Sequence, residues 1–123
     1  MTSFDAETFS LLAASEEVEI VTAWPDGRLM RTIIWVVVEG DEVFLRSVRG
    51  DRGRWYQAAL DRPTDVELRV DGRRIAVRAD LAADEASVAR CSRGLETKYR
   101  RDPSLPSMLR PRVLGTTLRL QPR

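Results

Sequence analysis

Residues 33 to 38 form an unbroken apolar run, Ile-Ile-Trp-Val-Val-Val, which constrains the fold more than any other stretch. Successive side chains of a β-strand point to opposite faces of a sheet, so a half-buried strand needs an apolar residue only at every second position. The run therefore predicts a strand that is covered on both faces. One face can fill the interior of a barrel. The other face requires a helix, a flat ligand or a second subunit.

The strands predicted elsewhere follow one another through hairpins. Val66, Leu68 and Val70 alternate with charged residues, and Asp71-Gly72 is a two-residue hairpin turn before the next apolar alternation. The six predicted strands are residues 18–23, 28–38, 42–48, 65–70, 73–79 and 113–120. Sequential antiparallel strands without alternating helices, in a chain of this length, predict a small barrel. The fold class is therefore mainly β, with residues 1–123 as a single domain.

Three flanking helices are predicted. The first begins at an N-cap, Asp5, where Phe4 and Phe9 occupy the positions of a hydrophobic staple. A short helix covers residues 54–60, and a longer one begins near Asp84. The apolar stripe of the longer helix consists of Val88, Cys91, Leu95 and Tyr99. This spacing favours a place in the core for the stripe, Cys91 included.

Composition excludes several classes of function. The net charge is only +1, whereas non-specific nucleic-acid binding requires a large basic surface. A single cysteine excludes an internal disulfide and fits a reducing compartment. The acidic N-terminus does not resemble a signal peptide, and no apolar stretch approaches the length of a membrane span. We therefore expect a cytoplasmic protein that binds neither nucleic acid nor membranes.

The chain contains no histidine and one cysteine. Histidine is the commonest general base and metal ligand, so zinc sites and Cys-His or Ser-His catalysis are excluded. We expect no metal site. An enzyme with this composition has to take its reactivity from a cofactor, or from carboxylates, tyrosine and arginine.

A basic loop follows the apolar strand. Between Arg46 and Arg54 the net charge is +3, and Gly50 and Gly53 allow the backbone to approach a ligand closely. Arginine clusters bind phosphate through charge-assisted hydrogen bonds. An apolar wall beside such a cluster suits a ligand with a flat apolar end and a phosphorylated tail, as in flavin mononucleotide (FMN) and the deazaflavin coenzyme F-420. The alternative is an ordinary solvated loop.

Residues 31–56 resemble the FMN-binding split barrel of the pyridoxamine 5'-phosphate oxidase-like superfamily, which includes flavin- and deazaflavin-dependent reductases. The resemblance is greatest to a small bacterial family of unknown function within it. It implies a six-stranded antiparallel split β-barrel with flanking helices. The ring-binding strand would comprise Arg31, Thr32, Ile33, Ile34 and Trp35. The phosphate site would comprise Arg46, Ser47, Arg49, Arg52 and Arg54. The C-terminal segment from Arg119 to Pro122 is similar to the ending of the oxidases, where the arginine holds pyridoxal phosphate.

The chain departs from the oxidases in two respects: the lysine of the phosphate clamp is absent, and the chain is shorter. Pyridoxamine phosphate is therefore not the expected substrate, and some relatives of this fold bind no flavin. The first hypothesis is a homodimer that binds FMN or F-420 and transfers a hydride to a small organic substrate. Trp55 would line the pocket and Tyr56 would donate a proton. The alternatives are a non-redox ligand-binding or dimeric interaction protein on the same barrel, and a cofactor-free enzyme of specialised metabolism.

Overall fold

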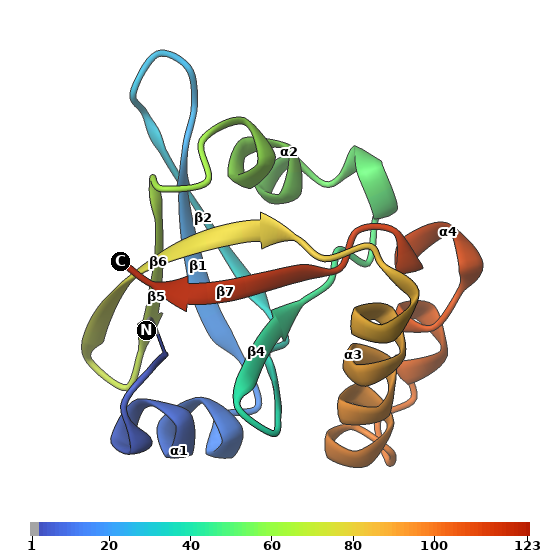
Figure 1. Ribbon diagram of the computed structural model, residues 1–123. Coiled ribbons are helices and arrows are strands. Elements are labelled where there is room, and N and C mark those ends of the chain that lie inside the picture. Colours follow the sequence, from blue (N-terminus) through green and yellow to red (C-terminus); the bar gives the residue numbers. More distant parts are fainter. Residues whose placement is uncertain (1–2) are drawn as a thin grey trace.

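The computed structural model describes residues 3–123 as one curled antiparallel sheet of seven strands with flanking helices (Figure 1). The strands are β1 (Val18–Ala23), β2 (Leu29–Ile34), β3 (Val37–Glu39), β4 (Glu42–Leu45), β5 (Val66–Val70), β6 (Arg73–Leu81) and β7 (Leu118–Pro122). The α-helices are α1 (Ala6–Ala14), α2 (Arg54–Asp61), α3 (Glu85–Lys98) and α4 (Pro111–Leu114). Two short 3₁₀ helices are η1 (Gly50–Arg52) and η2 (Leu105–Met108). The predicted mainly β, antiparallel fold is confirmed.

The order of the strands explains why the sheet curls. Across the sheet the order is β2-β1-β5-β6-β7-β4-β3, so the two outermost strands, β2 and β3, are consecutive in the chain. Only Trp35 and Val36 separate the end of β2 from the start of β3. A two-residue connection cannot span a flat sheet of this width. The sheet therefore bends until its two edges lie close together.

The predicted strand over residues 28–38 is divided at Val36, which is why the sheet has seven strands and not six. The backbone of Val36 bonds to the end of α3 instead of to a neighbouring strand. Its N–H donates to the Tyr99 hydroxyl (3.3 Å), and its carbonyl accepts from Lys98 Nζ (2.7 Å). The Tyr99 hydroxyl in turn donates to the carbonyl of Glu16 (2.6 Å). Buried backbone groups need such partners, so α3 makes the break between the strands possible.

The apolar run packs on both sides of the sheet for most of its length. Val36 is fully buried inside the barrel, whereas Val37 lies in a second apolar cluster beneath α3. The other members of that cluster are Phe44, Ala82, Cys91, Leu95, Tyr99 and Met108. Three of the four predicted stripe residues are therefore core residues, and Val88 is partly buried. Ile33 differs from the expectation, because 59% of it is exposed within this chain.

The hairpin of β5 and β6 has the register predicted from its two-residue turn. Val66 lies opposite Val77 and Arg69 opposite Arg74. Glu67 forms ion pairs with Arg69 (2.7 Å) and Arg74 (3.2 Å) on the outer face. The alternation therefore determined both the pairing and the buried face of this hairpin.

The first helix also begins as predicted: Asp5 accepts a hydrogen bond from the Thr8 N–H (2.7 Å), and the rings of Phe4 and Phe9 are in edge-on contact. Besides the break at Val36, two strand boundaries differ from the prediction by three residues or more. β4 ends at Leu45, and the last strand begins at Leu118, because Pro111 starts the short helix α4 where a strand from residue 113 was expected.

Among residues 3–123, no helix combines the length and the apolarity that a membrane crossing requires.

Arg46, directly after β4, is a buried cation with only 2% of its surface exposed. Its guanidinium donates to the hydroxyls of Thr117 and Ser92 and to the carbonyls of Met108 and Val88, each at 3.0 Å. These acceptors belong to α3, η2 and the segment before β7, so one side chain joins three separate parts of the chain to the sheet. Burial lowers the pKa of Arg46, and no carboxylate among the described residues pairs with it.

The inward face of the β5–β6 hairpin can be tested with Val66→Asp. Val66 is 1% exposed, and an unpaired carboxylate at this position should lower the free energy of unfolding by about 3 kcal/mol or more. Leu81→Asp is the control, because Leu81 is 53% exposed on the neighbouring strand. Urea denaturation should show a much lower midpoint for Val66→Asp alone. Equal midpoints for the two variants would show that the assigned inner face is wrong.

The structural role of Arg46 predicts that Arg46→Met destabilises the fold although methionine fills a similar space. The change removes the donor to the buried Met108 carbonyl and to the buried Thr117 hydroxyl, and each such loss costs about 1–3 kcal/mol. We therefore expect a loss of at least about 2 kcal/mol in urea denaturation. Arg49→Met, at an exposed position, is the matched control and should change stability little. A stability loss that is no larger at residue 46 than at residue 49 would contradict this role.

Candidate functional site

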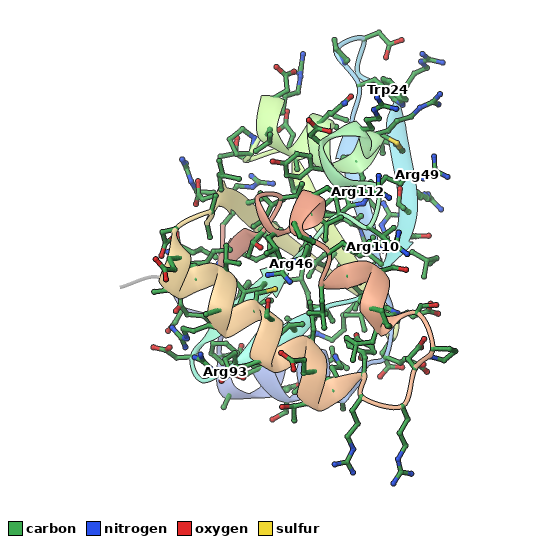
Figure 2. All side chains as sticks on the ribbon, turned by 90° about the vertical axis from the view of Figure 1, so that its right-hand side faces the viewer. Trp24, Arg46, Arg49, Arg93, Arg110 and Arg112 are labelled. Atoms are coloured by element: carbon green, nitrogen blue, oxygen red, sulfur yellow. The ribbon has the colours of Figure 1, made fainter. Side chains whose placement is uncertain are left out.

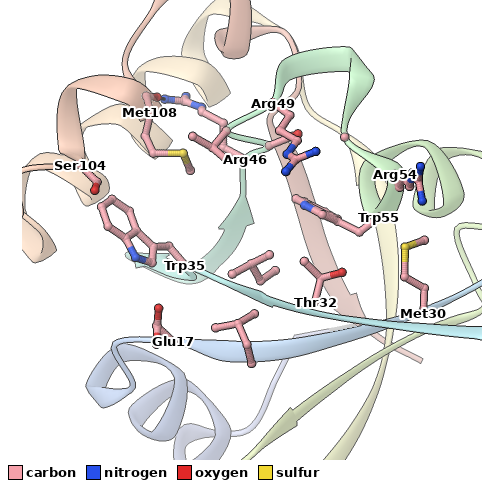
Figure 3. A pocket seen from close by; sticks show the side chains of 15 residues that line it. Glu17, Met30, Thr32, Trp35, Arg46, Arg49, Arg54, Trp55, Ser104 and Met108 are labelled. Carbon is pink, nitrogen blue, oxygen red and sulfur yellow. Dashed lines mark hydrogen bonds between the residues drawn. The ribbon is translucent and has the colours of Figure 1, made fainter.

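A cavity of about 520 Å³ lies between β2, the loop after β4 and the start of α2 (Figure 3). We call it the tryptophan cavity, because Trp35 and Trp55 both line it. Most of the site residues predicted from the sequence also line it: Thr32, Ile33, Ile34, Trp35, Arg46, Ser47, Arg49, Arg54 and Trp55. The sequence reasoning missed Glu17, Met30, Val48, Gly53, Ser104 and Met108. The volume lies within the range of small-molecule sites in proteins.

β2 forms one wall of the tryptophan cavity. Met30, Thr32 and Ile34 alternate along the strand and therefore share one face, and all three line the cavity. Met30 could have been found by extending the alternation backwards from Thr32. Ser104 and Met108 could not, because they reach the cavity from the proline-containing segment after α3. The wall is mainly apolar, with a single hydroxyl from β2.

Trp35 is fixed in the cavity by the break between β2 and β3. Its ring stacks on that of Tyr99, with the centroids 3.9 Å apart and the planes 5° from parallel. Tyr99 is buried, and its hydroxyl bonds to Glu16 and Val36. Burial is the main cause that raises the pKa of Tyr99 to about 12, so this hydroxyl keeps its proton at neutral pH. A rigid indole therefore forms the end of the cavity next to the sheet break.

The loop after β4 approaches the cavity at Ser47 and Gly53. The Ser47 hydroxyl is buried and has no hydrogen-bond partner among the described residues. A side chain at residue 53 would overlap this hydroxyl, so glycine is required by contact at this position. The Ser47 backbone N–H donates to the Thr116 hydroxyl (3.1 Å), which holds the loop against the segment before β7. An unsatisfied buried hydroxyl beside a cavity is unusual and points to a missing partner.

Two exposed arginines line the tryptophan cavity opposite its one carboxylate. Arg49 and Arg54 form no ion pair with any Asp or Glu among residues 3–123. Arg54 lies 6.0 Å from the centre of the Trp24 ring, which supports its guanidinium. Glu17 lines the other end, near Trp35 (Figure 3). The cavity is therefore apolar along its length and positive at one end.

Arg46 differs from its predicted role as a phosphate contact. It borders the tryptophan cavity, but four donor contacts of its guanidinium are already made within the protein. Neighbouring arginines therefore have different surroundings: Arg46 holds the fold together, whereas the side chains of Arg49 and Arg54 have no acceptor among the described residues.

Three predicted site residues lie outside the tryptophan cavity. Arg31 is exposed on the opposite face of β2 from Thr32, because neighbouring strand residues alternate. Arg52 lines a second, basic cavity nearby. Tyr56 is buried in the barrel core, where burial raises its pKa, while the neighbouring Trp55 lines the cavity. Consecutive helix residues point in directions about 100° apart, and here this rotation turns Tyr56 into the core while Trp55 lines the cavity.

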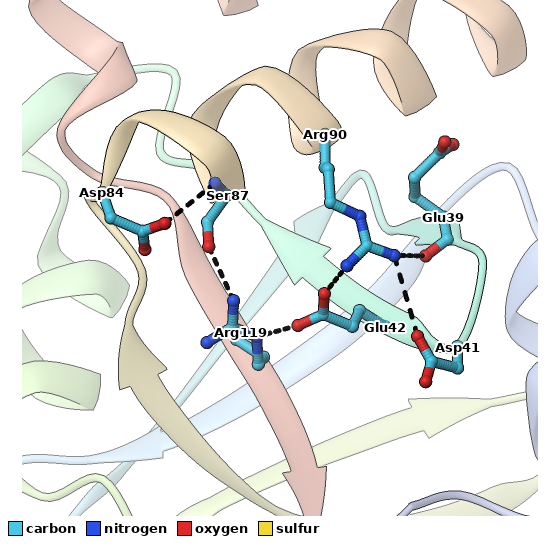
Figure 4. Close-up of polar contacts among 7 residues, drawn as sticks. All are labelled: Glu39, Asp41, Glu42, Asp84, Ser87, Arg90 and Arg119. Carbon is cyan, nitrogen blue, oxygen red and sulfur yellow. Dashed lines mark hydrogen bonds and ion pairs between the residues drawn. The ribbon is translucent and has the colours of Figure 1, made fainter.

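Arg119, from the oxidase-like C-terminal segment, also lies in a structural network (Figure 4). Its guanidinium contacts Glu42 and donates to the Ser87 hydroxyl (2.6 Å). Glu42 also pairs with Arg90, which donates to the carbonyl of Glu39 (2.8 Å). The network joins β4, β7 and α3 on the far side of the sheet from the barrel interior, and Arg119 does not line the tryptophan cavity.

Within residues 3–123 no group of three or more His, Cys, Asp or Glu side chains is arranged to hold a metal ion. The tryptophan cavity instead offers indole and aliphatic surfaces, the hydroxyls of Thr32, Ser47 and Ser104, and two arginines. These groups can bind a flat apolar body and an attached anion. They offer no strong nucleophile or general base apart from the carboxylate of Glu17.

Solved structures with very different sequences share this architecture. ChuZ from Campylobacter jejuni superimposes with a TM-score of 0.76 at 9% identity, covering 95% of this chain and 52% of that protein. HutZ, the heme storage protein from Vibrio cholerae, gives a TM-score of 0.65 at 12% identity, covering 98% and 91%. A putative pyridoxamine 5'-phosphate oxidase from Listeria innocua gives 0.62 at 12% identity, covering 95% and 90%.

These likenesses establish the fold as a split barrel of the pyridoxamine 5'-phosphate oxidase type. The chain spans about half the length of ChuZ, so that protein contains a substantial part without a counterpart here. No curated protein matches the sequence. One family does, over residues 8–120, which is nearly the whole chain. The chain therefore belongs to the bacterial family described as "Uncharacterized protein conserved in bacteria (DUF2255)".

Proposed function

We propose that the protein binds FMN or the deazaflavin F-420 in the tryptophan cavity and transfers a hydride to a small organic substrate. One observation carries the proposal: a cavity of about 520 Å³ has indole and aliphatic walls and ends at two arginines that no carboxylate of the described residues neutralises. A flat conjugated ring with an anionic tail matches this arrangement.

The residues present fit such a group. Ile34 and Trp35 provide an apolar wall for a ring, and the unpartnered Ser47 hydroxyl offers a donor to its polar edge or tail. Gly53 permits this position of the hydroxyl, because a side chain at residue 53 would overlap it. Arg49 and Arg54 are placed to hold a phosphate through charge-assisted hydrogen bonds. A bound flavin or deazaflavin would supply the redox chemistry, which a chain without histidine does not supply from its side chains.

The protein's own contribution is then binding and orientation. The Trp35–Tyr99 stack holds one wall rigid, and Arg46 fixes the loop that carries the arginines. Tyr56 lies in the core and is therefore not positioned to donate a proton to a ligand in the tryptophan cavity. Heme, which is named for HutZ, is less suited, because no histidine, cysteine or tyrosine of residues 3–123 lines the tryptophan cavity to hold the iron.

We also propose a homodimer. β2 is an edge strand of the sheet, and Leu29 and Ile33 on it are 60% and 59% exposed. An apolar edge strand is a site for pairing with another chain. Ile33 also lines the tryptophan cavity, so a second copy on this edge would close the cavity from outside.

Ligand titration tests the cofactor proposal. FMN should bind the wild type about tenfold or more tightly than riboflavin, which lacks the phosphate, because one charge-assisted contact contributes about 1.5–3 kcal/mol. Arg54→Gln should weaken FMN binding and leave riboflavin binding unchanged. Arg93→Gln, an exposed arginine on α3, should change neither. Quenching of tryptophan fluorescence reports binding, since Trp35 and Trp55 line the cavity. Negligible affinity for FMN, F-420 and riboflavin alike would overturn the proposal.

The dimer is tested by light scattering at micromolar concentration. The wild type should have twice the monomer mass, and Ile33→Glu should shift it to the monomer by placing charge on the contact. Leu81→Glu, which is also exposed but lies on β6, should remain dimeric. A wild type of monomeric mass, or equal behaviour of the two variants, would count against an interface at β2.

A further inference from the structure

A second cavity, of about 450 Å³, adjoins the tryptophan cavity on the face shown in Figure 2. It is lined by Val48, Arg49, Arg52, Ser107, Arg110 and Arg112, and we call it the arginine cavity. Val48 and Arg49 line both cavities, so the two are neighbours along the same loop. The sequence prediction included Arg49 and Arg52 but missed Arg110 and Arg112, which come from a segment almost sixty residues later in the chain.

The charge of the arginine cavity is not balanced by the protein. No acidic residue lines it, and none of its four arginines forms an ion pair with an Asp or Glu in the described part of the chain. Elsewhere carboxylates pair with arginines on the surface, as Glu67 does with Arg69 and Arg74. Four like charges around one hollow repel each other and raise the local potential for anions. A bound anion removes that repulsion.

The two arginine pairs are held together by close backbone packing. Gly50 has a φ of +66°, and a side chain on it would lie 3.2 Å from the Arg112 carbonyl oxygen. The loop after β4 therefore contacts α4 at a point where only glycine fits easily. The Thr116 hydroxyl accepts from the Ser47 N–H (3.1 Å) and donates to the Val113 carbonyl (2.7 Å), which ties the same two segments together a second time. The backbone that carries the four arginines is thus part of the fold and not a free loop.

We propose that the arginine cavity binds a polyanionic tail on the ligand whose ring occupies the tryptophan cavity. This inference rests on the proposed function and narrows it. A single phosphate can be held by Arg49 and Arg54, which line the tryptophan cavity; Arg52, Arg110 and Arg112 then remain without a counter-charge. A tail with several negative charges, from a diphosphate or from a phosphodiester with carboxylates, satisfies them with bidentate hydrogen bonds. Arg49 is the residue at which the two sites meet.

The test compares ligands of increasing tail charge on the full chain: riboflavin, FMN, FAD with its diphosphate, and F-420 with its phosphodiester and carboxylates. The wild type should bind FAD or F-420 at least tenfold more tightly than FMN. If FAD binds more tightly than FMN, the tail is a diphosphate; if F-420 does, the tail is a phosphodiester with carboxylates. The double variant Arg110→Gln/Arg112→Gln should remove that gain, with a loss of about tenfold or more, while the affinity for FMN changes less than about threefold.

The control variant is Arg93→Gln/Arg100→Gln, which removes the same charge from exposed positions that line neither cavity. It should bind every ligand as the wild type does. If FMN binds as tightly as FAD and F-420, and the double variant has no effect, the tail site is overturned and the flavin proposal stands. If no ring ligand binds the wild type, both proposals fail. Pyrophosphate binding that is lost in the double variant would then assign the arginine cavity to a free anion.

Discussion

The fold depends on how the chain passes through Val36 from one edge of the sheet to the other. Consecutive strands that form opposite edges force the sheet to curl, and the backbone at the crossing loses its strand neighbours. Tyr99 and Lys98 at the end of α3 supply the missing hydrogen bonds. Because Tyr99 also stacks on Trp35, the contact that closes the sheet is the one that orients an indole in the tryptophan cavity. Fold and site are therefore linked by a single residue.

Arg46 makes a second link in the structure, because it joins the sheet to α3, to η2 and to the residues before β7. Its buried charge is stabilised by hydrogen bonds to two carbonyls and two hydroxyls, and not by a carboxylate. Burying a cation in this way is costly unless every contact is made, so the segments that carry the acceptors are restrained together. Those segments include η2, which brings Met108 to the tryptophan cavity, and the residues before β7 that brace the basic loop.

Features that depend on residues close together in the sequence were predicted correctly, whereas features that depend on distant residues were not. The β5–β6 hairpin and the start of α1 depend on neighbours a few residues away, and both were predicted with the correct register and cap. The break at Val36 was not, because its cause is Tyr99, sixty-three residues later. In the basic loop the sequence indicated that arginines line a site. It did not separate Arg46, which bonds to buried acceptors, from Arg49, which faces a cavity, since burial is decided by distant segments.

The same reasoning explains why the net charge of +1 is a poor guide to this protein's surface. Glu42 and Glu67 are each shared by two arginines, so these carboxylates stabilise the sheet and its contact with α3. Within residues 3–123, the arginines of the loop after β4 and of the segment around α4 form no ion pair. A nearly neutral chain can thus hold a strongly positive hollow, because Coulomb interactions at a site depend on charges within about 10 Å and not on the total.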